Sequence, residues 1–97
     1  MISSDIKNKI ITYLIPFAPR KIGVFGSYAR NESTVNSDLD ILIDLKQNLN
    51  LLDLIGLEME LSEILGIKVD LITERSVNNL LRPYIEKDLE ILFSNEE

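Results

Sequence analysis

The run Gly26–Asp40 constrains the fold of this chain more than any other feature. It begins with Gly-Ser and ends with Asp-Leu-Asp. A short β-type run, Lys21–Phe25, precedes it, and a second one, Ile41–Ile43, follows it. The Gly-Ser turn is therefore expected to leave one strand, and the two carboxylates to open the next.

Asp38 and Asp40 stand two residues apart at the start of the second predicted strand. Successive side chains of a strand point to opposite faces, so both carboxylates should share one face while Leu39 points to the other. Neighbouring carboxylates repel by several kcal/mol, and one would ordinarily take up a proton. A divalent cation removes this conflict, and hard oxygen ligands suit magnesium. The alternative is a pair of solvated strand-edge residues, as in most isolated Asp-Leu-Asp sequences.

Gly26 and Ser27 form a candidate phosphate site. Glycine lets a backbone approach a ligand closely, and Tyr28–Arg30 could open a short helix whose N–H groups face an anion. An isolated Gly-Ser pair is usually a β-turn, but the carboxylates that open the next strand favour a nucleotide site. Arg30 has two interpretations: it contacts a phosphate, or it pairs with a local carboxylate such as Glu32.

The strand order follows if the turn and Asp38 meet at one nucleotide. The C-terminal end of the first strand then lies beside the N-terminal end of the second, and the two strands run antiparallel. This arrangement excludes a Rossmann sheet. The stretch Gly23–Gly26 also lacks the paired-glycine spacing of a dinucleotide site.

With these motifs the chain resembles the nucleotidyltransferase superfamily that includes DNA polymerase β, and most closely its minimal, antitoxin-type members. The resemblance rests on Gly26-Ser27, ten intervening residues and Asp38-Leu39-Asp40, and on the order of elements along nearly the whole chain. It implies an α/β fold, α+β in the strict sense, with a small mixed sheet flanked by helices as in a nucleotidyltransferase palm. It also implies that Asp38 and Asp40 bind two Mg²⁺ ions and that Gly26 and Ser27 hold a triphosphate. Asn31 replaces the glycine that close relatives often carry, which puts the opening of the short helix in doubt.

The same resemblance calls for a third carboxylate on a later strand, and Asp70 fits. It shares one strand face with Ile72, where a carboxylate is not expected to serve packing. Its implied role is metal ligand and proton acceptor from the attacking hydroxyl. In isolation, Asp70 would be a polar residue of an edge strand. Asp44 is a weaker candidate because it lies most of a strand length from the turn.

Composition limits the classes of function. The 97 residues include 10 Lys and Arg against 16 Asp and Glu, and this net charge of −6 disfavours direct binding to nucleic acid. Without histidine there is no His general base, no catalytic triad and no common zinc site. The absence of cysteine fits a cytoplasmic protein. Neither a signal peptide nor a membrane-spanning run is evident, and the length predicts a single domain, 1–97.

Periodicity and turn signals predict the other elements. A first helix is expected to be capped by Ser3 or Ser4 and to be ended by Pro16 and Pro19. The strand that opens with Asp38 runs to about Leu45, and a third strand covers 67–73.

The C-terminal part is predicted to be helical. Pro83 fits the first turn of a last helix, in which Ile85, Leu89 and Leu92 would form the apolar stripe. The tail 94–97 is expected to fray.

A helix over 51–65, closed by Gly66, has more apolar residues than one core face needs. A second stripe lies beside the core-facing one and consists of Leu52, Ile55 and Met59. Either the helix is broadly buried, or this stripe is a surface for a partner or an oligomer.

The resemblance implies a magnesium-dependent nucleotidyltransferase that moves AMP from ATP onto a hydroxyl and releases pyrophosphate. It further implies that the acceptor is a tyrosine of a HEPN-domain toxin, which adenylylation would silence. A first alternative is a binding antitoxin that masks its toxin without catalysis, against which three retained acids argue. A second is transfer to a small molecule such as an aminoglycoside, made less favourable by the lack of a second domain.

Overall fold

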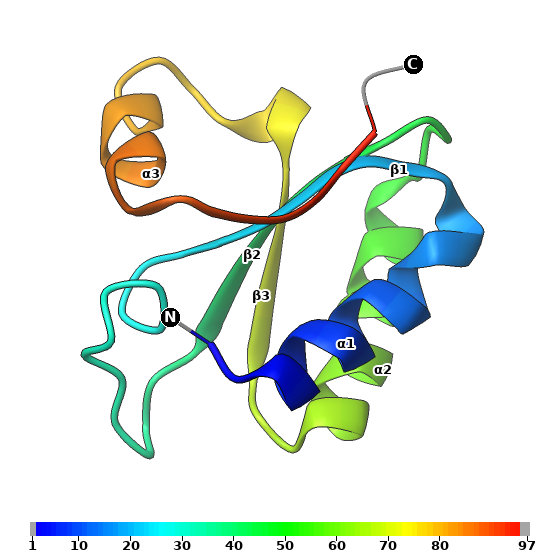
Figure 1. The fold of residues 1–97 in the computed structure, drawn as a ribbon. Helices are drawn as coiled ribbons and strands as arrows, with labels where there is room; N and C mark the ends of the chain where they lie inside the picture. Colours follow the sequence, from blue (N-terminus) through cyan, green and yellow to red (C-terminus); the bar gives the residue numbers. More distant parts are fainter. Residues whose placement is uncertain (1, 96–97) are drawn as a thin grey trace.

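In the part of the chain that the structure describes, four strands form one mixed sheet in the order β3-β2-β1-β4. The computed structural model describes residues 2–95 (Figure 1). β1 is antiparallel to both β2 and β4, whereas β2 and β3 are parallel. The antiparallel pairing that the Gly-Ser turn predicts is thus confirmed, as is the mixed α/β architecture. The strand bounds are β1 Pro19–Phe25, β2 Leu39–Leu45, β3 Val69–Thr73 and β4 Glu90–Ser94.

Helices cover both faces of the sheet. α1 (Ser4–Leu14) and α2 (Leu51–Leu65) lie on one side, and the short α3 (Arg82–Asp88) lies on the other (Figure 1). The main core lies between the sheet and the first two helices, where alternate strand residues meet the inner faces of the helices. Its fully buried members include Ile10, Leu14, Ile22, Val24, Leu39, Ile41, Ile43 and Leu61.

Caps set the ends of α1 and α2. The Ser3 hydroxyl accepts a hydrogen bond from the Ile6 amide at 3.2 Å, as the sequence predicts. Asn50 and Asp53 form a reciprocal capping box at the start of α2, and Gly66, with φ 68°, ends it. Both helices therefore begin where the sequence predicts, and α2 also ends there. α1 ends at Leu14, before the predicted prolines, because a 3-10 turn, Ile15–Phe17, takes up Pro16, and Pro19 opens β1.

β3 is an edge strand, and side chains of α2 satisfy its outward N–H groups. The Val69 amide donates to the Ser62 hydroxyl at 2.9 Å, and the Leu71 amide donates to Glu58 Oε2 at 2.8 Å. An edge of unpaired N–H groups would otherwise invite pairing with another chain. The two hydrogen bonds therefore fix α2 along this edge, and the face of α2 that points away from β3 is turned outward.

The C-terminal prediction of one long helix is wrong. α3 ends at Asp88, and Leu92 belongs to β4, which pairs with β1. Leu89, also expected in the helix, lies over Gly23, where a Cβ would come within 2.6 Å of its Cδ1 atom. The spacing of apolar residues fits a helix, but the free edge of β1 supplies hydrogen bonds that a helix could not use.

The expected fraying of the tail is also wrong for its described part. Ser94 is the last residue of β4, and the Asn95 amide donates to the Arg20 carbonyl at 2.8 Å. Glu96 and Glu97 lie outside the described residues. Within 2–95, no helix is long and apolar enough to cross a membrane.

Candidate active site

Gly26 turns the chain out of β1 directly beside Asp40. Its φ is 76°, in the left-handed region that glycine adopts without strain. A Cβ at this position would lie 2.3 Å from Asp40 Oδ2, closer than real Cβ atoms approach. Two separate features therefore require glycine at this position: the left-handed turn, and the close approach of the Asp40 carboxylate.

The chain after Gly26 forms a single helical turn rather than the short helix expected over Tyr28–Arg30. The Arg30 amide donates to the Gly26 carbonyl at 3.1 Å, and the Glu32 amide donates to the Ser27 carbonyl at 2.8 Å. Asn31 ends the turn with a left-handed φ of 63°. Asparagine tolerates this conformation, so it can take the place of glycine and stop the helix at one turn.

The structure brings the three predicted acids to one end of the sheet. Asp40 of β2 and Asp70 of β3 are direct partners in the parallel register, and Asp40 is also the partner of Phe25 at the end of β1. Asp38 immediately precedes β2, and it is separated from Asp40 in sequence by Leu39, whose side chain is fully buried in the core. The adjacency of Gly26, Asp40 and Asp70 thus follows from two strand pairings.

The charges of Asp70 and Asp38 oppose the ionisation of Asp40. Partial burial, followed by the charges of Asp70 and Asp38, raises the pKa of Asp40 above its ordinary value, although Arg30 acts in the opposite direction. Asp38 pairs weakly with Lys68, whose Nζ lies 3.8 Å from Asp38 Oδ2 on the exposed surface. The site therefore carries more negative charge than its neighbours neutralise.

This donor set fits magnesium. As the side chains stand, no three acids among residues 2–95 converge into a ready-made metal cage. Magnesium, however, is usually held by one or two carboxylates, with substrate phosphates and water completing its coordination. Two carboxylates in register, with a third one residue before the strand, provide that kind of open site.

Arg30 is held by carboxylates. Its Nη1 donates to Asp88 Oδ2 at 2.7 Å, and its Nε donates to Glu32 Oε1 at 3.3 Å. The hydrogen bond to Asp88, followed by that to Glu32, raises the pKa of Arg30. The pairing interpretation is therefore the one that the structure favours, and it joins the Gly-Ser turn to α3.

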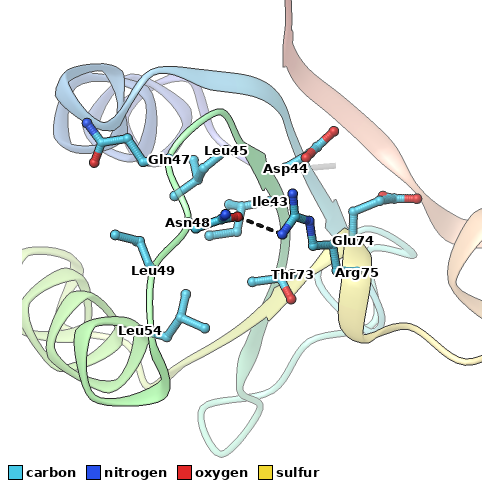
Figure 2. Close-up of a pocket in the computed structure, with 10 residues that line it drawn as sticks. All are labelled: Ile43, Asp44, Leu45, Gln47, Asn48, Leu49, Leu54, Thr73, Glu74 and Arg75. Carbon is cyan, nitrogen blue, oxygen red and sulfur yellow. Dashed lines mark hydrogen bonds between the residues drawn. The ribbon is translucent and has the colours of Figure 1, made fainter.

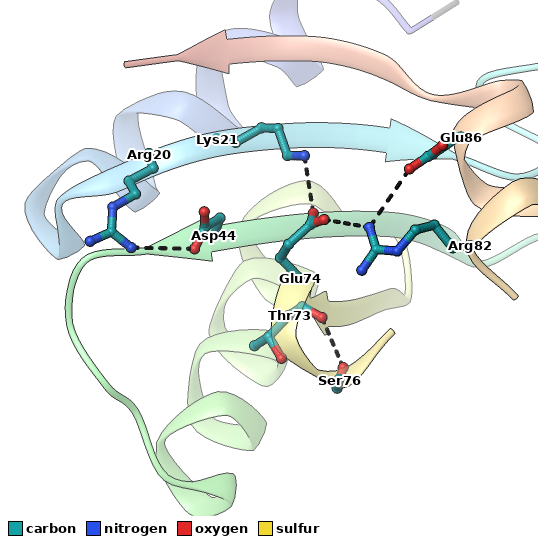
Figure 3. A network of polar contacts seen from close by, with 8 residues as sticks. All are labelled: Arg20, Lys21, Asp44, Thr73, Glu74, Ser76, Arg82 and Glu86. Carbon is teal, nitrogen blue, oxygen red and sulfur yellow. Dashed lines mark hydrogen bonds and ion pairs between the residues drawn. The ribbon is translucent and has the colours of Figure 1, made fainter. Parts of the chain in front are cut away.

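A polar network fixes the other end of α3. Glu74, which follows β3, lies between Lys21 of β1 and Arg82 of α3 (Figure 3). Arg82 Nη1 donates to Glu74 Oε1 at 2.6 Å, and the buried Oε2 makes an ion pair with Lys21 Nζ at 3.0 Å without good hydrogen-bond geometry. Burial by itself raises the pKa of Glu74, but the contacts with Arg82 and Lys21 outweigh it and lower that pKa.

Glu74, Arg82 and Asp88 had no sequence signal, because their partners lie on other elements. Asp44 is nearby but belongs to a different contact: its Oδ1 lies 3.8 Å from Arg20 Nη1. It is separate from the three acids, as its position in the strand predicts.

A small pocket of about 90 Å³ opens at the opposite end of the sheet from the acids. Figure 2 shows its lining at the ends of β2 and β3 and the start of α2, where Arg75 Nη1 donates to Asn48 Oδ1 at 2.6 Å. None of the predicted site residues lines it. The pocket therefore adds nothing to the acidic site.

The second stripe of α2 is exposed. Leu52, Ile55 and Met59 are 78%, 42% and 63% exposed, whereas Leu57 and Leu61 face the core. The interpretation of α2 as a broadly buried helix is therefore wrong. A contiguous apolar face of this kind is typical of a binding surface.

The family profile "Polymerase beta, Nucleotidyltransferase" matches residues 8–97. The chain belongs to this family. Over 71 residues it is 55% identical to a Methanocaldococcus jannaschii protein provisionally named a protein adenylyltransferase, a match covering 73% of this chain and 69% of that relative. The resemblance drawn from the motifs and the assignment as a nucleotidyltransferase enzyme are thus confirmed.

Two solved structures show the same fold. One is a toxin-antitoxin with AMP-PNP, with a TM-score of 0.84 and 28% identity over 93% of this chain and 74% of that chain. The other is the tri-AMPylated HEPN toxin of Shewanella oneidensis in complex with the MNT antitoxin, with a TM-score of 0.80 and 25% identity over 98% and 75%. The roles of individual residues in this member of the family stay predictions.

Proposed function

We propose that this enzyme transfers AMP from ATP to a hydroxyl on a partner protein, a tyrosine of a HEPN-domain toxin. The observation that carries the proposal is the register of Asp40 and Asp70 beside Gly26, which joins a metal-binding carboxylate pair to a turn that can approach phosphates. The named relatives and the complexed structures support the adenylyl group and the toxin partner.

The chain's own residues have separate roles. The acceptor oxygen bonds to the α-phosphorus, the bond from that phosphorus to the bridging oxygen breaks, and pyrophosphate leaves. Asp70, which is exposed, accepts the hydroxyl proton. Asp38 and Asp40 would hold two Mg²⁺ ions, with Asp70 as a further ligand. The ions would neutralise the phosphates and lower the pKa of the acceptor hydroxyl. Gly26 and Ser27 would hold the triphosphate.

The surface properties support a protein acceptor. The net charge of −6 opposes binding to nucleic acid, whereas the exposed stripe of Leu52, Ile55 and Met59 offers an apolar face on α2. The same stripe supports one competing function, an antitoxin that binds and masks its toxin without modifying it. Catalysis and masking therefore have to be separated by experiment.

The test uses ATP labelled at either the α- or the γ-phosphate, with magnesium and a candidate HEPN toxin. Adenylyl transfer labels the toxin from the α-phosphate alone, because the γ-phosphate leaves with pyrophosphate. Asp38→Asn, Asp40→Asn and Asp70→Asn should reduce labelling to background. Asp44→Asn is the matched control, since Asp44 lies in β2 but contacts Arg20, and it should label normally.

The outcomes separate the two functions. Full labelling by Asp40→Asn would contradict the site assignment. Protection of cells by Asp38→Asn as complete as that by the natural sequence would favour masking over modification.

A further inference from the structure

A pocket of about 490 Å³ lies between α3 and the Gly-Ser turn, a size typical of small-molecule sites. The turn contributes Gly26 and Arg30, and β3 contributes Ile72. Gly26 also contacts Asp40, so the pocket begins where the acidic site ends. A ligand held at Asp40 by its phosphates could extend into this pocket without leaving the surface.

The lining is suited to a flat, largely apolar group. Phe25, Ile72, Leu81, Tyr84 and Ile85 surround the space. Tyr84 lies in α3, and Leu81 immediately precedes this helix. Although α3 packs on the sheet, the Tyr84 side chain is 73% exposed and that of Leu81 is 53% exposed. An aromatic ring in this setting offers a stacking surface, which any nucleobase can use.

Three charged residues line the pocket: Lys87 is a cation, Asp88 is an acid, and Arg30 is already paired. The Arg30 guanidinium is already bound by Asp88 and Glu32, and the Asp88 carboxylate would repel an anion. The Arg30–Asp88 pair and the Glu74–Arg82 pair also hold α3 at both ends. The wall that carries Tyr84 is therefore positioned before any ligand binds.

We propose that this pocket holds the nucleobase of the donor nucleotide and that Tyr84 stacks on it. This inference rests on the proposed function, which supplies the donor and places its triphosphate at Gly26. It adds a specificity-determining residue on α3, outside the Gly-Ser and Asp-Leu-Asp motifs. The competing occupant is the acceptor side chain of a partner protein.

The test compares two ligands by calorimetry, the magnesium complexes of ATP and of tripolyphosphate, which lacks a base. Tyr84→Ala should weaken ATP roughly 5- to 100-fold, as expected for the loss of one base stack, and leave tripolyphosphate unchanged. Tyr84→Phe keeps the ring and should bind ATP normally. Leu80→Ala is the matched control, because Leu80 is 82% exposed near Tyr84 but does not line the pocket.

Other outcomes overturn the proposal. Equal weakening of both ligands by Tyr84→Ala, or no weakening of either, would show that no base stacks on Tyr84. If Tyr84→Ala instead raised only the KM for the acceptor, the acceptor would occupy the pocket. Unchanged ATP binding by Tyr84→Ala together with loss in Asp40→Asn would overturn this inference alone, whereas equal ATP binding in Asp40→Asn and the natural sequence would overturn the proposed function.

Discussion

Replacement of Gly26 by alanine is the most direct test of how the turn and the acids are coupled. Gly26 combines a φ of 76° with the contact to Asp40, and a Cβ would lie 2.3 Å from the Oδ2 atom. Gly66 also has a positive φ, 68°, but a Cβ there would meet nothing within 4 Å. Gly66→Ala is therefore a matched control that has the backbone strain and lacks the contact.

The structure sets the size of the two effects. A left-handed alanine costs about 1–2 kcal/mol, part of which is offset because alanine restricts the unfolded chain by about 0.4–1 kcal/mol. Gly66→Ala should thus lose about 1 kcal/mol, or roughly 4–8 °C in Tm for a domain of this size. Gly26→Ala should lose more, about 1–3 kcal/mol, because Asp40 must also leave its rotamer at about 0.5–1.5 kcal/mol.

The difference between the variants should be much larger in activity than in stability. A misplacement of about 1 Å can cost about 100-fold in rate, so Gly26→Ala should lose AMP transfer by about that factor. Gly66→Ala should transfer normally. Melting curves by circular dichroism and the α-labelled ATP assay measure the two quantities. Normal transfer by a folded Gly26→Ala protein would refute the coupling of the turn to Asp40.

Three further predictions concern the ligand, the polar network and the partner surface. Magnesium with ATP at 100 times its Kd should stabilise the natural sequence by about 2.7 kcal/mol and Asp38→Asn much less; equal thermal shifts would place the ligand elsewhere. The pKa of Glu74 is lowered in the folded state, so its stabilising contribution is complete above the ordinary carboxyl pKa and is lost as the pH falls through the lower, folded value. Glu74→Gln should therefore cost about 1–3 kcal/mol of stability at neutral pH and reduce the loss of stability between neutral and acidic pH. Glu86→Gln, at the exposed end of the same network, should change stability little. If Glu74→Gln lost as much stability on acidification as the natural sequence does, this prediction would be contradicted. Met59→Glu should remain folded, because the Met59 side chain is 63% exposed. It should leave ATP binding unchanged and weaken toxin binding about 10-fold or more, which corresponds to a loss of at least about 1.4 kcal/mol of binding free energy. A pull-down of the toxin as strong as that by the natural sequence would exclude this stripe as the partner surface.

Local sequence was sufficient for the elements whose ends carry their own signals. Ser3, the Asn50–Asp53 capping box and Gly66 mark helix ends through hydrogen bonds and φ angles within a few residues. The Gly-Ser turn and the Asp-Leu-Asp motif likewise predict that β1 and β2 run antiparallel, on the hypothesis that both contact one ligand, and the pairing is antiparallel.

Features that depend on contacts with residues far along the chain were determined only by the tertiary structure. Leu92 has the spacing of a helix stripe, yet it lies in a strand because β1 offers an unpaired edge. The exposure of Met59 depends on how Glu58 and Ser62 fix α2 along β3. Arg30 is compatible with a phosphate or an ion pair in sequence, and Asp88, 58 positions further along the chain, determines which. The sequence alone determines the chemistry of this site, since carboxylates and glycine have fixed properties, but pairing and packing determine which atoms those groups contact.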